Sequence, residues 1–232
     1  YQAHQYLPEI RSLLKQGKND QAQDLINRHF VCVGPGSGGP KWGCFQTLGN
    51  LRMEFLGQEG PVEDYSRSLD LQHAVARLNY RQQGVQFSRE YFTSFGDDAG
   101  VIRLTASQKG KISLRLSLDR SVRAESFVEG EELVLQGQLD NGVDGKGMQF
   151  LSRLKARQKG GRIIMEKNAI RIENADEVDV FFVTDTDFKG KDFAQRTVQS
   201  LAEALSKSYA QQLTAHKAHF QSKFNRLSFS MG

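Results

Sequence analysis

The stretch Leu69–Ser94, LDLQHAVARLNYRQQGVQFSREYFTS, decides the class of fold. Apolar side chains recur at every second position, on one face of each half: Ala74, Ala76, Leu78 and Tyr80, then Val85, Phe87, Tyr91 and Thr93. This period of two predicts strands that are half buried on a core. Gln82-Gln83-Gly84 predicts a tight turn, because glycine adopts a positive φ at little cost. We therefore expect a β-hairpin here, at the centre of a sheet.

The rest of the chain beyond this hairpin repeats the pattern of short strands and turns. Lys111–Arg120 shows it most clearly, since four apolar side chains are expected to point inward: Ile112, Leu114, Leu116 and Leu118. With Val101–Ser107 it predicts a second hairpin, turning at Lys109-Gly110. Further strands are predicted from residue 46 onward and at 133–139, 148–157, 162–165, 169–172 and 178–184. Short strands joined by tight turns predict a mainly β fold of antiparallel sandwich sheets.

Helical spacing of apolar residues marks the two ends of the chain. Pro8–Phe30 predicts a helix or a helical pair, in which Asn19 or Asp20 would cap the second half. Phe193–Phe224 contains no glycine or proline and predicts one or two helices. These final helices have no evident surface to pack on, so we expect that a further segment follows them.

The predicted elements divide the chain into two parts. Residues 1–190 would form the β-sandwich domain, with an N-terminal helical segment at about residues 8–30. Residues 191–232 would form a helical linker that leads toward another domain.

The composition is that of a folded globular chain, with 38% hydrophobic and 25% charged residues among 232. The net charge is +4, but basic and acidic residues are interleaved, and no Lys/Arg block predicts a nucleic-acid groove. No apolar run reaches the roughly 18 residues of a membrane span. Because the sequence opens at Tyr1 without a signal peptide, we expect a processed chain or an excised piece.

No group of residues predicts a catalytic centre or a metal site. A GxSxG elbow is absent, and the acidic residues fall mostly at turns and strand ends, where spacing cannot reveal a facing pair. Cys32 and Cys44 flank a glycine-rich loop, and either a disulfide or two buried thiols fits them. His216 and His219 would share a helix face but have no third ligand, so no metal site is predicted.

The glycine-rich loop Gly34–Gly43 carries Trp42, the single tryptophan of the chain. A flat indole on such a loop suits stacking against the C–H face of a pyranose, and it also suits plugging the loop onto the sandwich. The residues alone leave both interpretations open.

Several stretches, in order over nearly the whole chain, together resemble the N-terminal domain of the glycoside hydrolase family 95 α-L-fucosidases. They begin with LPEIRSLLKQGKNDQAQDLINRHF, then GPGSGG followed by WG, and QTLGNLRMEF. The set is completed by YSRSLDLQHAVARLNYRQQGVQFSREYFTS, GMQFLSRLKARQKGG, VTDTDF and AHKAHFQSKFNRLSFSMG. Each match is weak alone, but jointly they are specific.

The resemblance implies a β super-sandwich, a helical linker and an (α/α)6 barrel that holds the catalytic groups. It implies inverting hydrolysis of terminal α-L-fucosyl linkages on glycans, typically α-1,2, without a cofactor and in a periplasmic or secreted enzyme. No residue here matches a family catalytic position, and the family's LPIGNGRLGA-like and NEDTLW-like opening strands are absent. In the family, the loop ahead of QTLG faces the barrel, which makes Trp42 and Gln46 candidate substrate-binding residues.

Three hypotheses therefore stand. The chain would be a non-catalytic sandwich domain that supports a fucosidase barrel, and its linker helices would then expose an apolar patch. Alternatively it would be a stand-alone carbohydrate-binding module that depends on Trp42. The third hypothesis is a structural or adhesive sandwich with no role in sugar binding.

Overall fold

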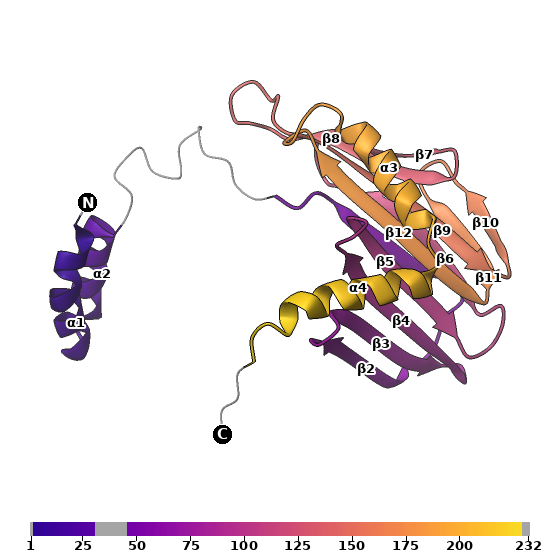
Figure 1. The fold of residues 1–232 in the computed structure, drawn as a ribbon, viewed down its shortest axis with the longest axis horizontal. Coiled ribbons are helices and arrows are strands. Elements are labelled where there is room, and N and C mark those ends of the chain that lie inside the picture. The colour runs from indigo at the N-terminus through magenta and orange to yellow at the C-terminus, as the bar shows by residue number, and fades with distance from the viewer. Residues whose placement is uncertain (1, 31–45, 229–232) are drawn as a thin grey trace. The chain divides into compact units, whose positions relative to one another are not determined.

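The computed structural model describes residues 2–30 and 46–228, which fall into two compact units, Tyr1–Cys44 and Phe45–Gly232 (Figure 1). The first unit is a helical hairpin that contains the short helix η1 (Ala3–Tyr6), α1 (Leu7–Lys15) and α2 (Asn19–His29). Among the described residues of this unit, Ile10 and Ala22 are buried. The helical pair is confirmed, but the predicted cap is wrong: Lys18 occupies the N-cap position of α2 without a side-chain hydrogen bond. The bond from Lys18 N to Leu13 O closes the preceding turn instead.

The second unit contains two antiparallel sheets, so the predicted mainly β, sandwich class of fold is confirmed. The smaller sheet has the order β1-β6-β11-β10, and the larger has the order β2-β3-β4-β5-β12-β9-β8-β7. Their strands are β1 (Asn50–Phe55), β2 (Glu63–Asp70), β3 (Val75–Gln82), β4 (Val85–Ser94), β5 (Ala99–Ala106), β6 (Ile112–Asp119), β7 (Ala124–Glu129), β8 (Glu132–Gln138), β9 (Gln149–Lys159), β10 (Arg162–Met165), β11 (Ile170–Ala175) and β12 (Glu177–Thr186).

The main core lies between the sheets. The four inward side chains predicted on β6 are all at most 8% exposed: Ile112, Leu114, Leu116 and Leu118. They pack with Leu133, Leu154 and Ile170, among others. Burial of each such side chain contributes roughly 1.5–3 kcal/mol.

The hairpin of β3 and β4 forms as predicted, but its expected central place in the sheet is wrong. β3 and β4 are the second and third strands from one edge, and β5 and β12 occupy the middle. Leu69 belongs to the edge strand β2, and Ala74 lies in the turn before β3 with a φ of 50°. The strand β7, which was not predicted, pairs with β8 at the other edge.

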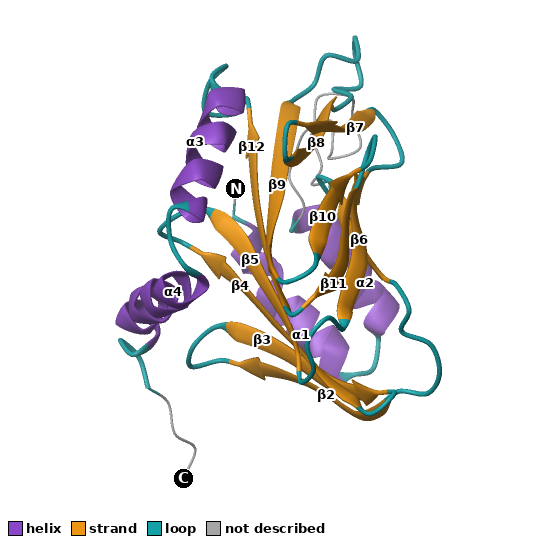
Figure 2. Ribbon diagram, turned by 90° about the vertical axis from the view of Figure 1, so that its right-hand side faces the viewer, coloured by secondary structure: helices purple, strands orange, loops and turns teal. Residues whose placement is uncertain are grey.

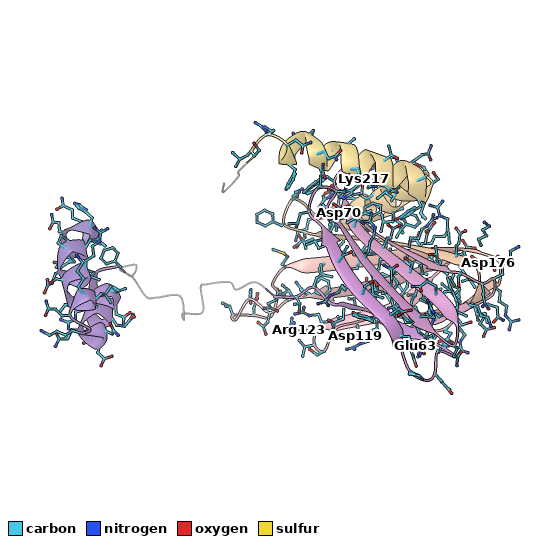
Figure 3. The ribbon with its side chains drawn as sticks, turned by 90° about the horizontal axis from the view of Figure 1, so that it is seen from below. Glu63, Asp70, Asp119, Arg123, Asp176 and Lys217 are labelled. Carbon is cyan, nitrogen blue, oxygen red and sulfur yellow. The ribbon has the colours of Figure 1, made fainter. Side chains whose placement is uncertain are left out.

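The predicted hairpin around Lys109-Gly110 is also wrong, because β5 and β6 belong to different sheets. The connections from β9 to β10 and from β11 to β12 cross between the sheets in the same way. Asp176, which lies between β11 and β12, contacts the other two connections. Its carboxylate accepts a hydrogen bond from Gly110 N (2.7 Å), and its own backbone N donates to Lys159 O (2.7 Å). The three turns are therefore connections between the two sheets. Figure 3 labels Asp176, which lies at one end of the sandwich.

Two helices, α3 (Phe193–Leu205) and α4 (Tyr209–Phe224), cover part of the outer face of the larger sheet (Figure 1). The expectation that they would pack on nothing is wrong, since Leu201 and Ala204 are fully buried against outer-face side chains such as Phe181. The central strands carry apolar residues on both faces, which gives the helices a surface. No helix among the described residues is long and apolar enough to cross a membrane.

Candidate functional site

The junction between α4 and the larger sheet contains a network of hydrogen bonds and ion pairs. Tyr209, at the start of α4, donates its hydroxyl hydrogen to Glu90 Oε2 (2.7 Å) on β4. Arg77 Nε donates to the other oxygen of Glu90 (2.8 Å), and Arg77 also pairs with Asp70 (3.3 Å). The beginning of α4 is therefore tied to three neighbouring strands.

A second arginine extends this network across the sheet. Arg103 lies over the ring of Tyr209, 3.9 Å from its centroid, and binds Asp179 through two bonds of 2.7 Å each. A bidentate arginine–carboxylate contact fixes the relative orientation of the two side chains and also pairs their charges. Arg157 donates to the carbonyl oxygens of Leu205 (3.0 Å) and Lys207 (2.9 Å), so it holds the corner between α3 and α4.

The electrostatics of this network keep its groups in one protonation state. Burial alone would raise the pKa of Glu90, but the hydrogen bonds from Tyr209 and Arg77 outweigh it and leave that pKa below its ordinary value. Burial and the bond to Glu90 raise the pKa of the Tyr209 hydroxyl. Glu90 therefore stays ionised and Tyr209 stays a donor, which is the arrangement of a permanent structural bond.

His216 anchors the middle of α4. Its ring is 2% exposed, stacks on Phe92 with centroids 4.8 Å apart, and places Nε2 at 2.9 Å from His73 O and 3.1 Å from Ala74 O. Nε2 must carry the hydrogen, because both partners are carbonyl oxygens. His219 stacks on Phe95 (5.4 Å), so the two histidines are packing residues, and no metal-binding group occurs among the described residues.

An aromatic row continues along α4 from this anchor. The ring of Phe220 lies 6.3 Å from His216 and 5.4 Å from Phe224. Phe224 is 47% exposed, and Leu227 just beyond the helix is 83% exposed. The row begins at the buried core and ends in solvent, so one end of α4 is apolar and exposed while the polar network holds the other end.

A cavity of about 480 Å³ lies where α3 crosses the ends of β4, β5 and β12. Asp98, Asp185, Lys189 and Arg196 line it. Asp185 binds Arg196 (2.6 Å) and Thr186 N (2.7 Å); burial would raise its pKa, but these bonds outweigh burial and lower it. Asp185 and Arg196, which lie close together in this lining, thus form a hydrogen-bonded ion pair.

Among the described carboxyl groups whose pKa departs from its ordinary value, every pKa is lowered: Asp70, Glu90, Asp119, Glu131, Asp144, Glu166, Asp185 and Asp187. The general acid of a glycosidase needs a raised pKa in order to hold its proton. None of these eight groups fits that role.

The two candidate substrate-binding residues, Trp42 and Gln46, lie far from α4 in the sequence. Gln46 is exposed and its Oε1 accepts a bond from Arg120 Nη2 (2.8 Å), beside the Arg52–Asp119 ion pair. Trp42, Cys32 and Cys44 lie outside the described residues, so the site predicted around Trp42 stays a prediction. Glu90 and Tyr209 were missed: Tyr209 lies inside the predicted helical segment Phe193–Phe224, and no pattern in the sequence connects it with Glu90.

Two antiparallel sheets that pack face to face, with two helices on one outer face, define the class of fold: a β-sandwich domain with helices on one side. Residues 1–191 match the family model described as glycosyl hydrolase family 65, N-terminal domain, and the chain belongs to that family.

Similar proteins agree with a glycosidase context. The chain is 26% identical over 219 residues to alpha-L-fucosidase 2 of Arabidopsis thaliana, covering 81% of this chain and 26% of the relative. It is 24% identical over 244 residues to probable alpha-fucosidase A of Aspergillus niger, covering 97% of this chain and 29% of the relative. The chain thus spans between a quarter and a third of the length of these relatives.

Among solved structures, the chain resembles a putative kojibiose phosphorylase from the human microbiome. The TM-score is 0.54 at 14% sequence identity, and the match covers 73% of this chain and 27% of that one. At this identity the likeness concerns the fold alone.

Proposed function

We propose that the chain is the non-catalytic N-terminal sandwich domain of a family 95 α-L-fucosidase-type hydrolase. The parent enzyme would remove terminal α-L-fucosyl groups, typically α-1,2-linked, from glycans with inversion, in a periplasmic or secreted location. Residues 1–190 would form the sandwich domain with its N-terminal helical segment at about residues 8–30, and residues 191–232 would lead to the (α/α)6 barrel. The family match and the two fucosidase relatives support this assignment.

The observation that carries the proposal is the apolar end of α4. Phe224 and Leu227 are exposed by 47% and 83%, while the start of the same helix is fixed by Tyr209 and Glu90. A helix that is fixed at one end and apolar at the other suits a docking element, because covering the apolar end removes it from water. The catalytic barrel would cover it.

A chimera tests the docking role. The chain replaces the matching quarter of the Arabidopsis relative, and release of fucose from an α-1,2-fucosylated trisaccharide is measured. We expect hydrolysis by the chimera, none by the chain alone, and a loss of about tenfold or more in the double variant Phe224→Ser, Leu227→Ser. Val143→Ser, at a residue 80% exposed on a distant loop, is the matched control.

Two results would contradict the proposal. One is fucose release by the isolated chain, which would require a catalytic pair within it. The other is a folded chimera, verified by circular dichroism, in which the double variant is as active as the Val143→Ser control.

Trp42 and Gln46 remain our proposed rim of the substrate site. Titration with the same trisaccharide, followed through the fluorescence of the single tryptophan, tests this placement. A saturable change that depends on Trp42 in the isolated chain would favour the carbohydrate-binding module instead. A flat trace from the isolated chain, together with an active chimera, would favour the supporting domain.

A further inference from the structure

The outer face of the larger sheet is only partly covered by the two helices. Helix α3 packs mainly on β12 and β9, and α4 packs on β4, so the outer face of β7 and β8 stays largely open among the described residues (Figure 2). This face points away from the main core, which lies between the two sheets. A strand added at the edge of either sheet would extend that sheet and would leave this outer face uncovered.

The strand register arranges the outward side chains of this region in two rows. Glu125 on β7 lies opposite Gln136 on β8, which lies opposite Leu151 on β9. Gln138 and Gln149 form the next row. The alternate residues of β8 belong to the core between the sheets, so the glutamines of this strand point outward. Cross-strand neighbours lie about 4.5–5.5 Å apart at Cβ, close enough to contact one ligand together.

A cavity of about 550 Å³ lies over these rows, and we call it the β7–β8 cavity. Its lining includes two apolar side chains, Leu151, which is 6% exposed, and Phe193 at the start of α3. Its polar lining comes from Arg123, Glu125 and the glutamines of both rows. Apolar surface with a few polar groups, in a volume of about 300–1,000 Å³, is typical of sites that bind small molecules.

Three polar side chains of the cavity lack a partner. Within the described residues, the side chains of Glu125, Gln136 and Gln149 make no hydrogen bond or ion pair. The outer face of the smaller sheet differs, since Arg115 on that face binds Glu166 at 2.7 Å. Charges that pair with each other leave few groups for a ligand, whereas two unpaired amides and a carboxylate offer several.

The chemistry of the lining selects the ligand. Each amide is both a donor and an acceptor, and the carboxylate is an acceptor, which together match the hydroxyl groups of a sugar. The ring of Phe193 matches the apolar C–H face of a pyranose. Arg123, the one cation of the described lining, already donates to Gln138 O (2.8 Å) and lies 3.6 Å from a carboxylate oxygen of Asp140, so charge does not favour an anion.

The same lining disfavours other occupants. A metal ion needs several acceptor groups, and Glu125 is the only carboxylate among the described lining residues. A protein domain packed over the cavity would remove Glu125 and the unpaired glutamines from water, which costs free energy unless each of them finds a partner. Charged residues are accordingly depleted at the centres of protein interfaces.

We propose that the β7–β8 cavity binds a neutral oligosaccharide. Gln136 and Gln149 exchange hydrogen bonds with its hydroxyl groups, Glu125 accepts a bond from one of them, and one sugar ring lies against Phe193. This site goes beyond the proposed function, because binding requires neither Trp42 nor a catalytic domain and is measured on this chain alone.

Calorimetric titration of the 232-residue chain tests the proposal with two neutral probes: the α-1,2-fucosylated trisaccharide and cellotetraose, which contains no fucose. We expect saturable binding of at least one probe, with a dissociation constant of about 1 mM or below. The two probes distinguish a glycan recognised through fucose from one recognised through its glucose backbone, and binding of either supports the site.

Variants assign the binding to the cavity. Gln136→Ala and Glu125→Ala change exposed side chains and should each weaken binding by about tenfold or more, with an unchanged circular dichroism spectrum. Gln195→Ala removes an exposed amide of α3 that does not line the cavity and should leave the affinity unchanged.

Trp42→Ala separates this site from the proposed rim of the substrate site, and it should also leave the affinity unchanged. Absence of binding by both probes, or binding that is lost in Trp42→Ala and kept in Gln136→Ala, would overturn the proposal. Fucose release by the chimera tests the proposed function separately, so the two proposals can fail independently.

Discussion

The two faces of the larger sheet differ in whether their arginines are paired with carboxylates. On the outer face, Arg77 and Arg103 each bind carboxylates at distances of 2.7–2.8 Å beneath α4. On the inner face, Arg67 and Arg89 have no carboxylate partner among the described residues, although they lie on strands of the same hairpin region. A paired charge restricts the geometry of the strands and the helix that it joins, whereas an exposed charge without such a partner contributes little to the stability of the fold.

The largest contrast between the faces should appear in stability. Phe181 is fully buried beneath the helices, so Phe181→Ala should lower the free energy of unfolding by about 3–5 kcal/mol through lost burial and a cavity. Tyr65→Ala on the bare inner face should change it by no more than about 0.5 kcal/mol. Urea unfolding followed by circular dichroism measures both. A large loss in Tyr65→Ala would show that the bare face is packed in solution.

The next effect concerns the bond that starts α4. Tyr209→Phe keeps the ring under Arg103 but removes the hydroxyl that donates to Glu90, and should cost about 1–3 kcal/mol. Tyr91→Phe, in which the inner-face hydroxyl has no hydrogen-bond partner among the described residues, is the matched control and should be near neutral. Equal effects of the two substitutions would mean that the outer network does not latch the helix.

A fall in pH should reduce the stability of the fold first through the carboxylates of the outer face. The folded-state pKa values of Glu90 and Asp70 lie below their unfolded values, so the stability that these groups contribute is present above about pH 4 and is lost as pH falls through the folded values. Glu90→Gln should therefore lower the Tm at pH 7 and flatten its decline between about pH 5 and pH 3. An unchanged decline would assign the acid sensitivity to other carboxyl groups.

The strands could be predicted because their signal is local. On β6, every second residue from Ile112 to Leu118 is apolar, and all four side chains are buried in the structure. The membership of a strand in one sheet or the other is not local. Lys109-Gly110 is an ordinary hairpin turn in sequence, and only the tertiary bond from Gly110 N to Asp176, 66 residues away, reveals it as a corner.

The surfaces were harder to predict than the strands. Glu90 and Tyr209 are 119 residues apart, and no spacing rule connects a β-strand carboxylate with the first residue of a helix. The row of Arg67, Leu78 and Arg89 depends on a register that shifts between Glu63 and Ser66. A one-residue change in that register would move Arg67 to the other face.

The smallest expected effect gives the sharpest test of the contrast between the faces. Arg67→Gln should leave the free energy of unfolding within about 0.5 kcal/mol of the parent chain, because its side chain is exposed and unpaired in the described structure. Arg103→Gln, which loses two bonds to Asp179, should cost clearly more. If both arginines affect stability alike, the inner face is a structural surface like the outer one.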